Sequence, residues 1–468
     1  MNRAVAGLTI RVVRTTDADA LTALRKIRES LSPSGEVVSP EGRKRTIAVF
    51  GEPLTPIQVV QKICRDVRTQ GFKAVAAYTE KLDGVRLTPK NVRVSEAELK
   101  AAHSSVEPEF LKAVRRIRRN IERFHAGVLP TTATLHDRDR CTLQLRYLPL
   151  KRVGICVPGG AASYPSTILM TAVPALVAGV EEIAVVSPPT QNGADSPYVR
   201  ATCYELGIRE LYRVGGAQGV AALAYGVTGI PAVDKIVGPG NLFVALAKRE
   251  VFGQVDIDML AGPTEVIVLA DRTARPAYVA SELISQAEHA PGCSILITWH
   301  DKLVDKVIRE LERQLATLER GELALQSLQE FGAIIVTRNA DEAVELVNEI
   351  APEHLYILTR EPRAILDRVK NAGAIFLGPY SPVASGDYAA GPSHVLPTGG
   401  TARFSSCLTS VDFLKRSSVI ELHPRGLLEL APDIEVLARV EGLTAHAASV
   451  RIRVDQIQAE QAAEPTES

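Results

Sequence analysis

Four short polar clusters between residues 285 and 446 hold the side chains best suited to chemistry. An amide and an imidazole lie three residues apart, a glutamate adjoins a histidine, an aspartate stands in a Gly-Asp-Tyr string, and a glutamate precedes a histidine by five residues. In chain order these are Gln286 and His289, Glu353 and His354, Asp387 with His394 close behind, and Glu441 and His446. Together the clusters offer the ligands of one divalent metal ion and a separate acid/base pair.

The first cluster predicts two ligands on one helix face. Residues 277–289 have the apolar spacing of a helix, so Gln286 and His289 leave the same side one turn apart. If they meet Asp387 and His446, one amide oxygen, two imidazoles and one carboxylate make a set suited to Zn²⁺, with Mn²⁺ or Co²⁺ as substitutes. The alternatives are a polar helix end, a turn aspartate and a packed or surface histidine.

The Glu353-His354 pair lies where Pro352 ends a helix and a strand begins. Neighbours in an extended chain point to opposite faces, so the two side chains can address different atoms of one substrate. A histidine can take a proton from an alcohol near neutral pH, and a nearby glutamate can activate water. The alternative is a solvated pair in a loop.

The elements around these clusters alternate between strand and helix patterns. After helical stretches at 54–82 and 95–125, short β-branched runs alternate with helical segments from residue 151 onwards, which is typical of parallel sheets. The expected strands are 152–157, 182–187, 210–214 and 234–237 in a first lobe, and 265–269, 294–298, 333–336, 354–358 and 373–377 in a second. The expected helices include 165–179, 197–206, 219–225, 241–252, 277–289 and 302–318.

Glycine-rich turns follow three of the expected strands, at 158–160, 215–218 and 238–241, although no GxGxxG follows any strand. Ligands of open parallel sheets bind beyond the carboxyl ends of strands, where glycine permits close backbone approach. We therefore expect the three turns, with the amides Gln218 and Asn241, to line one crevice. The alternative for each turn alone is a tight turn without a ligand.

Three further segments have a different character. Residues 378–400 show no clear strand or helix pattern, and irregular stretches of this length are usually functional loops. Residues 427–448 are expected to form a C-terminal helical segment, whereas 30–45 and 456–468 are expected to be flexible.

The composition limits the classes of function. The 54 basic and 54 acidic side chains balance among 468 residues, so nothing attracts the chain to nucleic acid or to an anionic membrane, and a small molecule is the expected partner. We expect a cytoplasmic protein, since the chain has no export signal and no apolar run of about 18 residues. The six cysteines form no CxxC pair, so His, carboxylate or amide groups must hold any metal.

Read together, these strings resemble the histidinol dehydrogenase family over nearly the whole chain, from about 54 to 454. The strings that carry the resemblance are 157–160, 215–218, 237–241, 257–263, 285–289, 351–355, 386–388 and 394–398. The resemblance implies a zinc-dependent, NAD-linked oxidation of L-histidinol to L-histidine through L-histidinaldehyde, in two hydride transfers that complete histidine biosynthesis. It also implies a homodimer with shared active sites.

The resemblance implies a role for each matched residue. His354 matches the general base and Glu353 the carboxylate that activates water. The metal ligands match Gln286, His289, Asp387 and His446, with His446 supplied by the partner subunit. Substrate-contacting positions match Thr264, Gln286, His289, His354, Asp387, His394, Glu441 and His446, and NAD-contacting positions match Cys156, Gln218 and Asn241. Cys156 stands where many relatives have tyrosine, with Tyr164 near enough to compensate, and Thr264 stands where others have serine.

The expected fold class is α/β, with two incomplete Rossmann-like parallel-sheet domains plus helical N-terminal and C-terminal extensions. Residues 1–50 are expected to form an N-terminal arm with a flexible insertion. Residues 51–150 and 265–408 are expected to form a first α/β domain with the catalytic and metal residues, and 151–264 a second one that binds NAD. Residues 409–468 are expected to form a C-terminal helical extension involved in dimerisation.

Three other functions stay open. The first is a dehydrogenase of the same scaffold that acts on another small hydroxy compound, although Glu441, matching a substrate-contacting position, and the full ligand set favour histidinol. The second is a metallohydrolase in which Glu353 activates metal-bound water, and it needs no NAD. The third is a metabolite-binding scaffold without catalysis, which the joint occurrence of an acid/base pair and metal ligands argues against.

Overall fold

The computed structural model describes residues 8–18, 20, 46–137, 139–160, 162–289 and 292–463. They divide into two compact units. The larger comprises Met1–Val128 and Leu150–Phe413, and the smaller comprises Leu129–Pro149 and Leu414–Ser468. The larger unit contains two parallel sheets, which confirms the expected α/β class.

The first sheet of the larger unit has the strand order β6-β5-β4-β7-β8, with all neighbours parallel. Its strands are β4 (Arg152–Cys156), β5 (Glu182–Ser187), β6 (Glu210–Arg213), β7 (Lys235–Val237) and β8 (Asp256–Ile257). One core joins it to α3 (Pro56–Gln70), α4 (Phe72–Asp83), α9 (Gly216–Tyr225) and α10 (Leu242–Val251). Helices α7 (Pro165–Ala178) and α8 (Pro197–Glu205) connect β4 to β5 and β5 to β6, and they lie outside this core.

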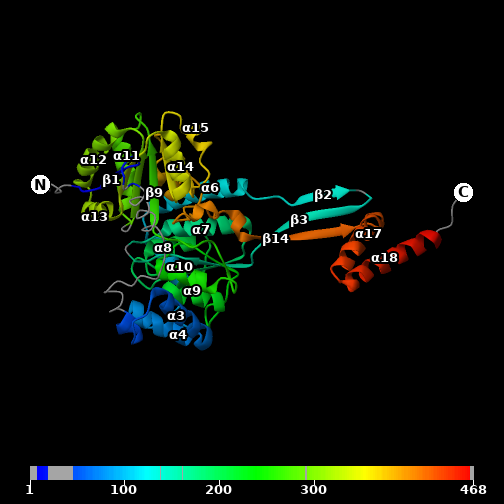
Figure 1. The fold of residues 1–468 in the computed structure, drawn as a ribbon. Helices are drawn as coiled ribbons and strands as arrows, with labels where there is room; N and C mark the ends of the chain where they lie inside the picture. The colour runs from blue at the N-terminus through cyan, green and yellow to red at the C-terminus, as the bar shows by residue number, and fades with distance from the viewer. Residues whose placement is uncertain are drawn as a thin grey trace. The chain divides into compact units, whose positions relative to one another are not determined.

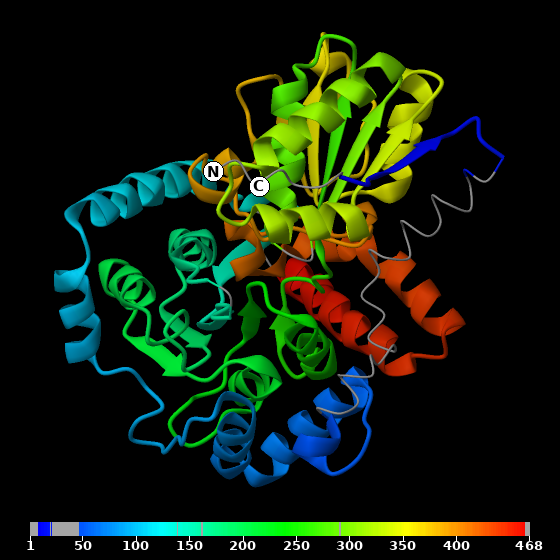
Figure 2. The ribbon, with the colours of Figure 1, turned by 90° about the vertical axis from the view of Figure 1, so that its left-hand side faces the viewer.

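The second sheet of the larger unit has the strand order β1-β11-β10-β9-β12-β13 and is also parallel throughout. Its strands are β1 (Arg11–Arg14), β9 (Thr264–Ala270), β10 (Gly292–Thr298), β11 (Ala333–Val336), β12 (His354–Leu358) and β13 (Ala374–Leu377). Helices α11 (Pro276–Ala287), α12 (Asp301–Leu315) and α13 (Gly321–Phe331) cover one face, and α14 (Ala340–Ile350) and α15 (Pro362–Leu366) cover the other, as Figure 1 shows on either side of β9. Figure 2 shows β1, in blue, at the edge of the sheet.

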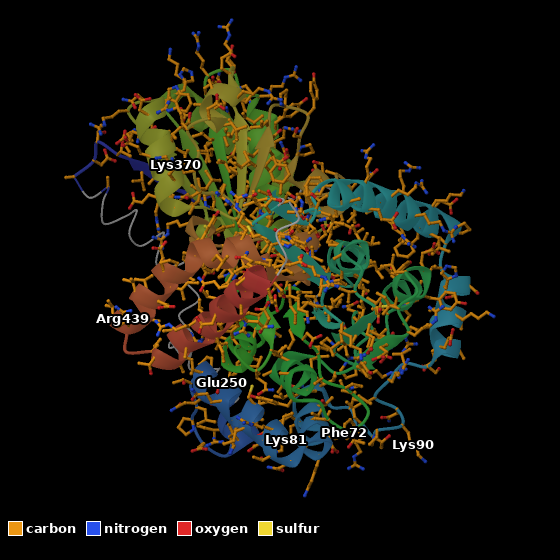
Figure 3. All side chains as sticks on the ribbon, turned by 90° about the vertical axis from the view of Figure 1, so that its right-hand side faces the viewer. Phe72, Lys81, Lys90, Glu250, Lys370 and Arg439 are labelled. Carbon is orange, nitrogen blue, oxygen red and sulfur yellow. The ribbon has the colours of Figure 1, made fainter. Side chains whose placement is uncertain are left out.

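The helical lead-in packs on the first sheet. Ile63 and Val67 of α3 and Val75 of α4 share a core with Leu223 of α9. In Figure 3, Phe72 and Lys81 mark α4 and Glu250 marks α10, and both helices pack on α3 and α9, whereas Lys370 lies in the lobe of the second sheet. This packing differs from the expected grouping of residues 51–150 with 265–408, because the apolar stripes of α3 and α4 complete the face of the β4 sheet.

Two further helices of the larger unit precede the first sheet in the chain. Helix α5 (Glu96–Ser105) begins at Ser95, whose hydroxyl accepts from the backbone of Glu98 while the Glu98 carboxylate accepts in return. Helix α6 (Pro108–Gly127) follows, with proline at its first position. The expected helical stretch 95–125 is therefore two helices, which meet at Val106 and Glu107.

The smaller unit is an antiparallel sheet followed by two helices. Strands β2 (Ala133–Asp137), β3 (Cys141–Pro149) and β14 (Leu414–Leu422) pair in the order β14-β3-β2, and Figure 1 shows them side by side. Helices α17 (Pro424–Val440) and α18 (Thr444–Ala463) follow, separated by a turn in which Gly442 has φ +72°. No described side chain of α18 is buried.

Some expectations fail in physically understandable ways. The smaller unit is part sheet and not only a helical extension, and the tail expected to be flexible is helical as far as Ala463. A short helix, α16 (Val383–Tyr388), interrupts the expected loop 378–400 because tertiary contacts hold it. The expected flexible segment 30–45 lies outside the described residues. Within the described part of the chain, no helix is both long and apolar enough to cross a membrane.

Candidate active site

A cavity of about 710 Å³ lies in the larger unit between groups contributed by both sheets. From the first sheet come Pro158, after β4, and the turn 238–241, after β7. From the second come Thr264, which begins β9, and Glu353 and His354 at the start of β12. In each sheet the two strands are neighbours where the strand order reverses. In the first sheet the cavity lies beyond their carboxyl ends, where open α/β sheets leave a crevice, whereas the second sheet contributes the amino ends of its two strands.

The connection between α14 and β12 places Glu353 and His354 at the cavity. Helix α14 ends at Ile350, and Ala351 then adopts a left-handed conformation with φ +53°. Pro352 prevents the helix from continuing, and the strand begins at His354. Glu353 and His354 are both buried, which excludes the solvated loop pair.

His354 presents one ring nitrogen to the cavity side. Its Nδ1 lies 3.1 Å from the carbonyl oxygen of Glu265, so Nδ1–H donates to this oxygen. Its Nε2 is 3.6 Å from Oδ1 of Asp387 and has no hydrogen-bond partner among the described residues. In the neutral ring the proton therefore sits on Nδ1, and Nε2 is the nitrogen that can accept a proton from a substrate.

Glu353 is fixed by two donors. Its Oε2 accepts from the Thr264 hydroxyl at 2.6 Å and from the backbone N–H of Glu265 at 2.9 Å. Gln286 Nε2 donates to the same Thr264 hydroxyl at 2.8 Å. The amide nitrogen of Gln286 is thus engaged with Thr264, which leaves its carbonyl oxygen as the atom available for a metal.

The charges of the site alter the pKa values of its members. Burial alone would lower the pKa of His354, but the carboxylates of Glu353 and Asp387 raise it to about 9. Burial raises the pKa of Glu353, and the positive charge of His354 and the Thr264 hydroxyl partly oppose this rise. Burial would also raise the pKa of Asp387, but the close approach of His354 and the charges of His394 and His289 lower it.

Glu265 is a member of the site that the sequence analysis did not single out. Its side chain is 1% exposed, and its Oε1 accepts from the backbone N–H groups of Glu353 (3.2 Å) and Gly399 (3.1 Å). Burial and the adjacent charge of Glu353 raise the pKa of Glu265 to about 8, so the carboxyl is largely neutral near pH 7. The available signal was a carboxylate at the start of a strand that otherwise reads as fully buried.

Asp387 lies on α16 and not in an irregular loop. Glu282 of α11 accepts a hydrogen bond from the backbone N–H of Val383 at 3.0 Å, which satisfies the first turn of this short helix. His394 Nδ1 lies 2.9 Å from the Asp387 carbonyl, and its Nε2 has no partner among the described residues. Asp387 and His394 both line the cavity.

The proposed metal ligands of the larger unit come from two neighbouring elements. His289 follows the end of α11, and its backbone N–H donates to the Gln286 carbonyl at 3.3 Å, so the two residues stay one turn apart. The positive charge of His289 contributes to the lowered pKa of Asp387. No group of three or more His, Cys, Asp or Glu side chains able to hold a metal occurs in the described ranges. An amide, an imidazole and a carboxylate fit a borderline divalent ion, but they need further ligands.

Glu441 and His446 belong to the smaller unit. Glu441 is the C-cap of α17, and His446 lies in the first turn of α18. Both are exposed. His446 is therefore not packed in a core, and its ring has no partner among the described residues of its own unit.

The cofactor candidates differ in their placement. Asn241 lines the cavity, and its Oδ1 accepts from the backbone N–H of Val244, so it also caps α10. Gln218 and Cys156 are buried and are not among the described residues that line this cavity, whereas Tyr164 is. Gln218 Nε2 instead donates to Asp83 at 3.3 Å.

Residues 215–218 are not among the described residues that line this cavity, so the expectation that this third glycine turn joins the same crevice stays a prediction. This turn follows the edge strand β6, two strands away from the reversal between β4 and β7. It is packed against Pro188, whose Cγ would lie 2.5 Å from a Cβ added at Gly215. This close packing at Gly215 is also what a tight turn without a ligand would require.

Two parallel sheets and a buried Glu-His pair facing a deep cavity define the protein as an α/β enzyme. The sequence profile of the family described as histidinol dehydrogenase matches residues 54–454. Among similar proteins, histidinol dehydrogenase of Rhodopirellula baltica is 54% identical over 449 residues, covering 95% of this chain and 98% of that protein. Histidinol dehydrogenase of Heliobacterium mobile is 49% identical over 401 residues, covering 86% and 94%.

The crystal structure of histidinol dehydrogenase from Elizabethkingia anophelis superimposes with a TM-score of 0.85 at 31% identity, covering 96% of this chain and 99% of that one. The chain therefore belongs to the histidinol dehydrogenase family and is an oxidoreductase.

Replacing Glu265 by glutamine is expected to flatten the pH dependence of stability. The pKa of this carboxyl rises from 4.5 to about 8 on folding, so its contribution to stability is complete below pH 4.5 and is lost as the pH rises through 8. Over that window Glu265 lowers the free energy of unfolding by up to about 1.4 kcal/mol per pH unit. Glutamine cannot ionise, and its amide oxygen can still accept from Glu353 and Gly399.

Urea unfolding at about pH 5 and about pH 8.5 tests this expectation. The urea midpoint of Glu265→Gln, relative to that of the wild type, should be higher at about pH 8.5 than at about pH 5. Glu312→Gln, which changes an exposed glutamate of α12, serves as the control and should show no such gain. An equal difference between Glu265→Gln and wild type at both pH values would contradict a neutral Glu265.

Proposed function

We propose that the protein is a cytoplasmic enzyme that oxidises L-histidinol to L-histidine through L-histidinaldehyde, in two NAD-linked steps that complete histidine biosynthesis. The observation that carries the proposal is the buried Glu353-His354 pair, with Nε2 of His354 free on the cavity side, in a chain of the histidinol dehydrogenase family. This arrangement supplies a base for an alcohol and a carboxylate for water within one pocket.

His354 acts as the base in both oxidations in its neutral form, whose population grows as the pH rises towards the His354 pKa of about 9. Its Nε2 takes the hydroxyl proton of the alcohol while the carbinol carbon loses a hydride, which leaves the aldehyde. Water then adds to the aldehyde, with Glu353 accepting the water proton, and His354 takes a hydroxyl proton from the hydrate as the second hydride leaves. NAD, when bound, accepts each hydride at its nicotinamide ring.

Gln286, His289 and Asp387, together with His446 of a partner subunit, would hold a zinc ion. The ion would act as a Lewis acid and a fixed point for the imidazole and amine of histidinol. The support in this structure is chemical. The amide oxygen of Gln286 is left free by Thr264, and histidines surround Asp387. Thr264, His394 and Glu441 complete the proposed substrate contacts.

The wall formed by residues 238–241 and Tyr164 is the proposed place for the dinucleotide. Its glycines allow the backbone to approach a ligand closely, and Asn241 offers an amide beside the N-terminus of α10. Residues 151–264 would thus form the NAD-binding domain. Cys156 and Gln218 stay predicted cofactor contacts, and reaching a dinucleotide would require Gln218 to leave Asp83.

The surface of the smaller unit supports a homodimer with shared active sites. Val440 is 80% exposed and Ile452 69% exposed, and no described side chain of α18 is buried. Exposed apolar side chains on two consecutive helices are typical of a surface that another protein chain covers. In the proposed dimer this unit carries Glu441 and His446 to the site of the partner.

The assay that tests the function measures NADH against histidinol consumed. Two NADH should form per histidinol, treatment with a strong chelator should abolish the activity, and added Zn²⁺ should restore it. Amino alcohols without an imidazole should be poor substrates because they lose one metal-binding group. Product formation without NAD would instead favour a metallohydrolase, preference for a substrate without imidazole another dehydrogenase, and ligand binding without NADH a scaffold.

The roles of two histidines can be separated by substitution. His354→Ala should lower kcat by roughly 10²–10⁴-fold, since the general base is removed, while the bound zinc is unchanged. His289→Ala should lose zinc because a proposed ligand is removed. Metal analysis alongside kinetics distinguishes them. The roles are reversed if His354→Ala protein lacks zinc and His289→Ala protein retains it.

Mixed dimers test whether His446 acts in the partner's site. His446→Ala and His354→Ala should each be inactive alone. After subunit exchange, one site of each hybrid dimer receives an intact His354 and an intact His446, so a random mixture should recover about a quarter of wild-type activity. Native mass spectrometry verifies the exchange, and exchanged subunits without recovered activity would contradict shared sites.

A further inference from the structure

The turn 238–241 has a backbone that few sequences could adopt. Gly238 has φ +104°, and a Cβ at this position would lie 2.4 Å from the carbonyl oxygen of Cys156. The turn is therefore pressed against the end of β4, and glycine is required there. Four consecutive residues, 238–241, line the cavity, so the shape of this wall depends on how Gly238 is held.

A buried ion pair holds both backbone groups of Gly238. Asp258 follows β8, and its Oδ2 accepts from the Gly238 N–H at 2.7 Å. Lys248 of α10 donates from Nζ to the Gly238 carbonyl at 3.1 Å, and the same ammonium group pairs with Asp258 Oδ1. The pair thus ties together the turn, α10 and the segment after β8.

Burial makes this pair costly if it serves stability alone. The side chain of Lys248 is 2% exposed and that of Asp258 0% exposed. The desolvation penalty of burying two charges offsets much of the free energy of their attraction. Apolar residues of similar volume often stabilise a fold equally well. Apolar residues, however, could not hold the N–H and the C=O of Gly238 at once. Lys248 and Asp258 also line the cavity themselves.

We propose that Lys248 and Asp258 are positioning residues that hold the 238–241 turn in the shape that receives the dinucleotide. They act through the turn on cofactor affinity, and not on proton transfer at His354. The inference rests on the proposed use of NAD. It assigns a role to Asp258, in the 257–263 string, and to Lys248 of α10, neither of which carries an expected chemistry of its own.

A second lysine–aspartate pair, which lies outside the cavity lining, joins β7 and β8 of the same sheet. Lys235 of β7 is also buried, and its Nζ lies 2.9 Å from Asp256 of β8. Lys235 and Asp256 are not among the described residues that line the cavity. Removing that pair perturbs neighbouring strands and charges without touching Gly238.

The experiment compares Lys248→Met/Asp258→Asn with Lys235→Met/Asp256→Asn in the full-length, zinc-loaded enzyme. The Lys248 and Asp258 double variant should raise KM for NAD at least tenfold, whereas KM for histidinol and kcat at saturating NAD should change less than threefold. Equilibrium titration with NADH, followed by its fluorescence, should show the same loss of affinity. The control should stay within twofold of wild type in every parameter.

If the double variant does not fold, Asp258→Asn decides alone. The asparagine keeps an oxygen for the Gly238 N–H but loses the charge opposite Lys248, so KM for NAD should still rise selectively. A folded variant with wild-type NADH affinity would overturn the inference, as would an equal rise of both KM values. Absence of NADH formation by the wild type would instead overturn the proposed function.

Discussion

Two buried carboxyl groups at the starts of neighbouring strands hold the reactive side chains in place. Glu265 gives its backbone N–H to the Glu353 carboxylate, and Glu353 gives its own to the carboxyl of Glu265. Two anions cannot both be stable in so dry a place, and burial together with the charge of Glu353 raises the pKa of Glu265 to about 8. Glu353 then carries the negative charge that helps raise the pKa of His354.

The two sheets contribute different kinds of chemical groups to the cavity. The first sheet supplies the carboxyl ends of β4 and β7, where glycine and proline leave the backbone accessible. The second supplies the amino ends of β9 and β12, where ionisable and hydroxyl side chains begin the strands. One wall thus offers main-chain contact to an extended ligand, and the other offers groups that can move protons.

Patterns local to a few residues were enough to predict much of this arrangement. The strand predicted at 182–187 is β5 without change, because a continuous apolar run can hardly be anything else in a buried parallel sheet. Glu353 and His354 were predicted as the reactive pair because two adjacent ionisable groups at the start of a buried strand indicate a functional site. Both residues do line the cavity.

Features that depend on contacts distant in the sequence could not be predicted in this way. Helix α16 exists because Glu282, about a hundred residues earlier, accepts from its first N–H. Two other features likewise depend on neighbours that only the folded chain brings together. They are the hydrogen bonds of Lys248 and Asp258 to Gly238 and the packing of residues 215–218 against Pro188. The periodicity of apolar residues along the sequence does not indicate such contacts.

The sheet of the smaller unit has a consequence for how the protein is made. Strand β14 begins about 265 residues after β3 ends, and the two pair along their full nine-residue length. At ribosomal speeds of about 5–20 residues per second, β3 waits roughly ten to fifty seconds for its partner. Throughout that time the nascent β2-β3 hairpin exposes an open edge, the kind of surface that aggregates unless a chaperone shields it.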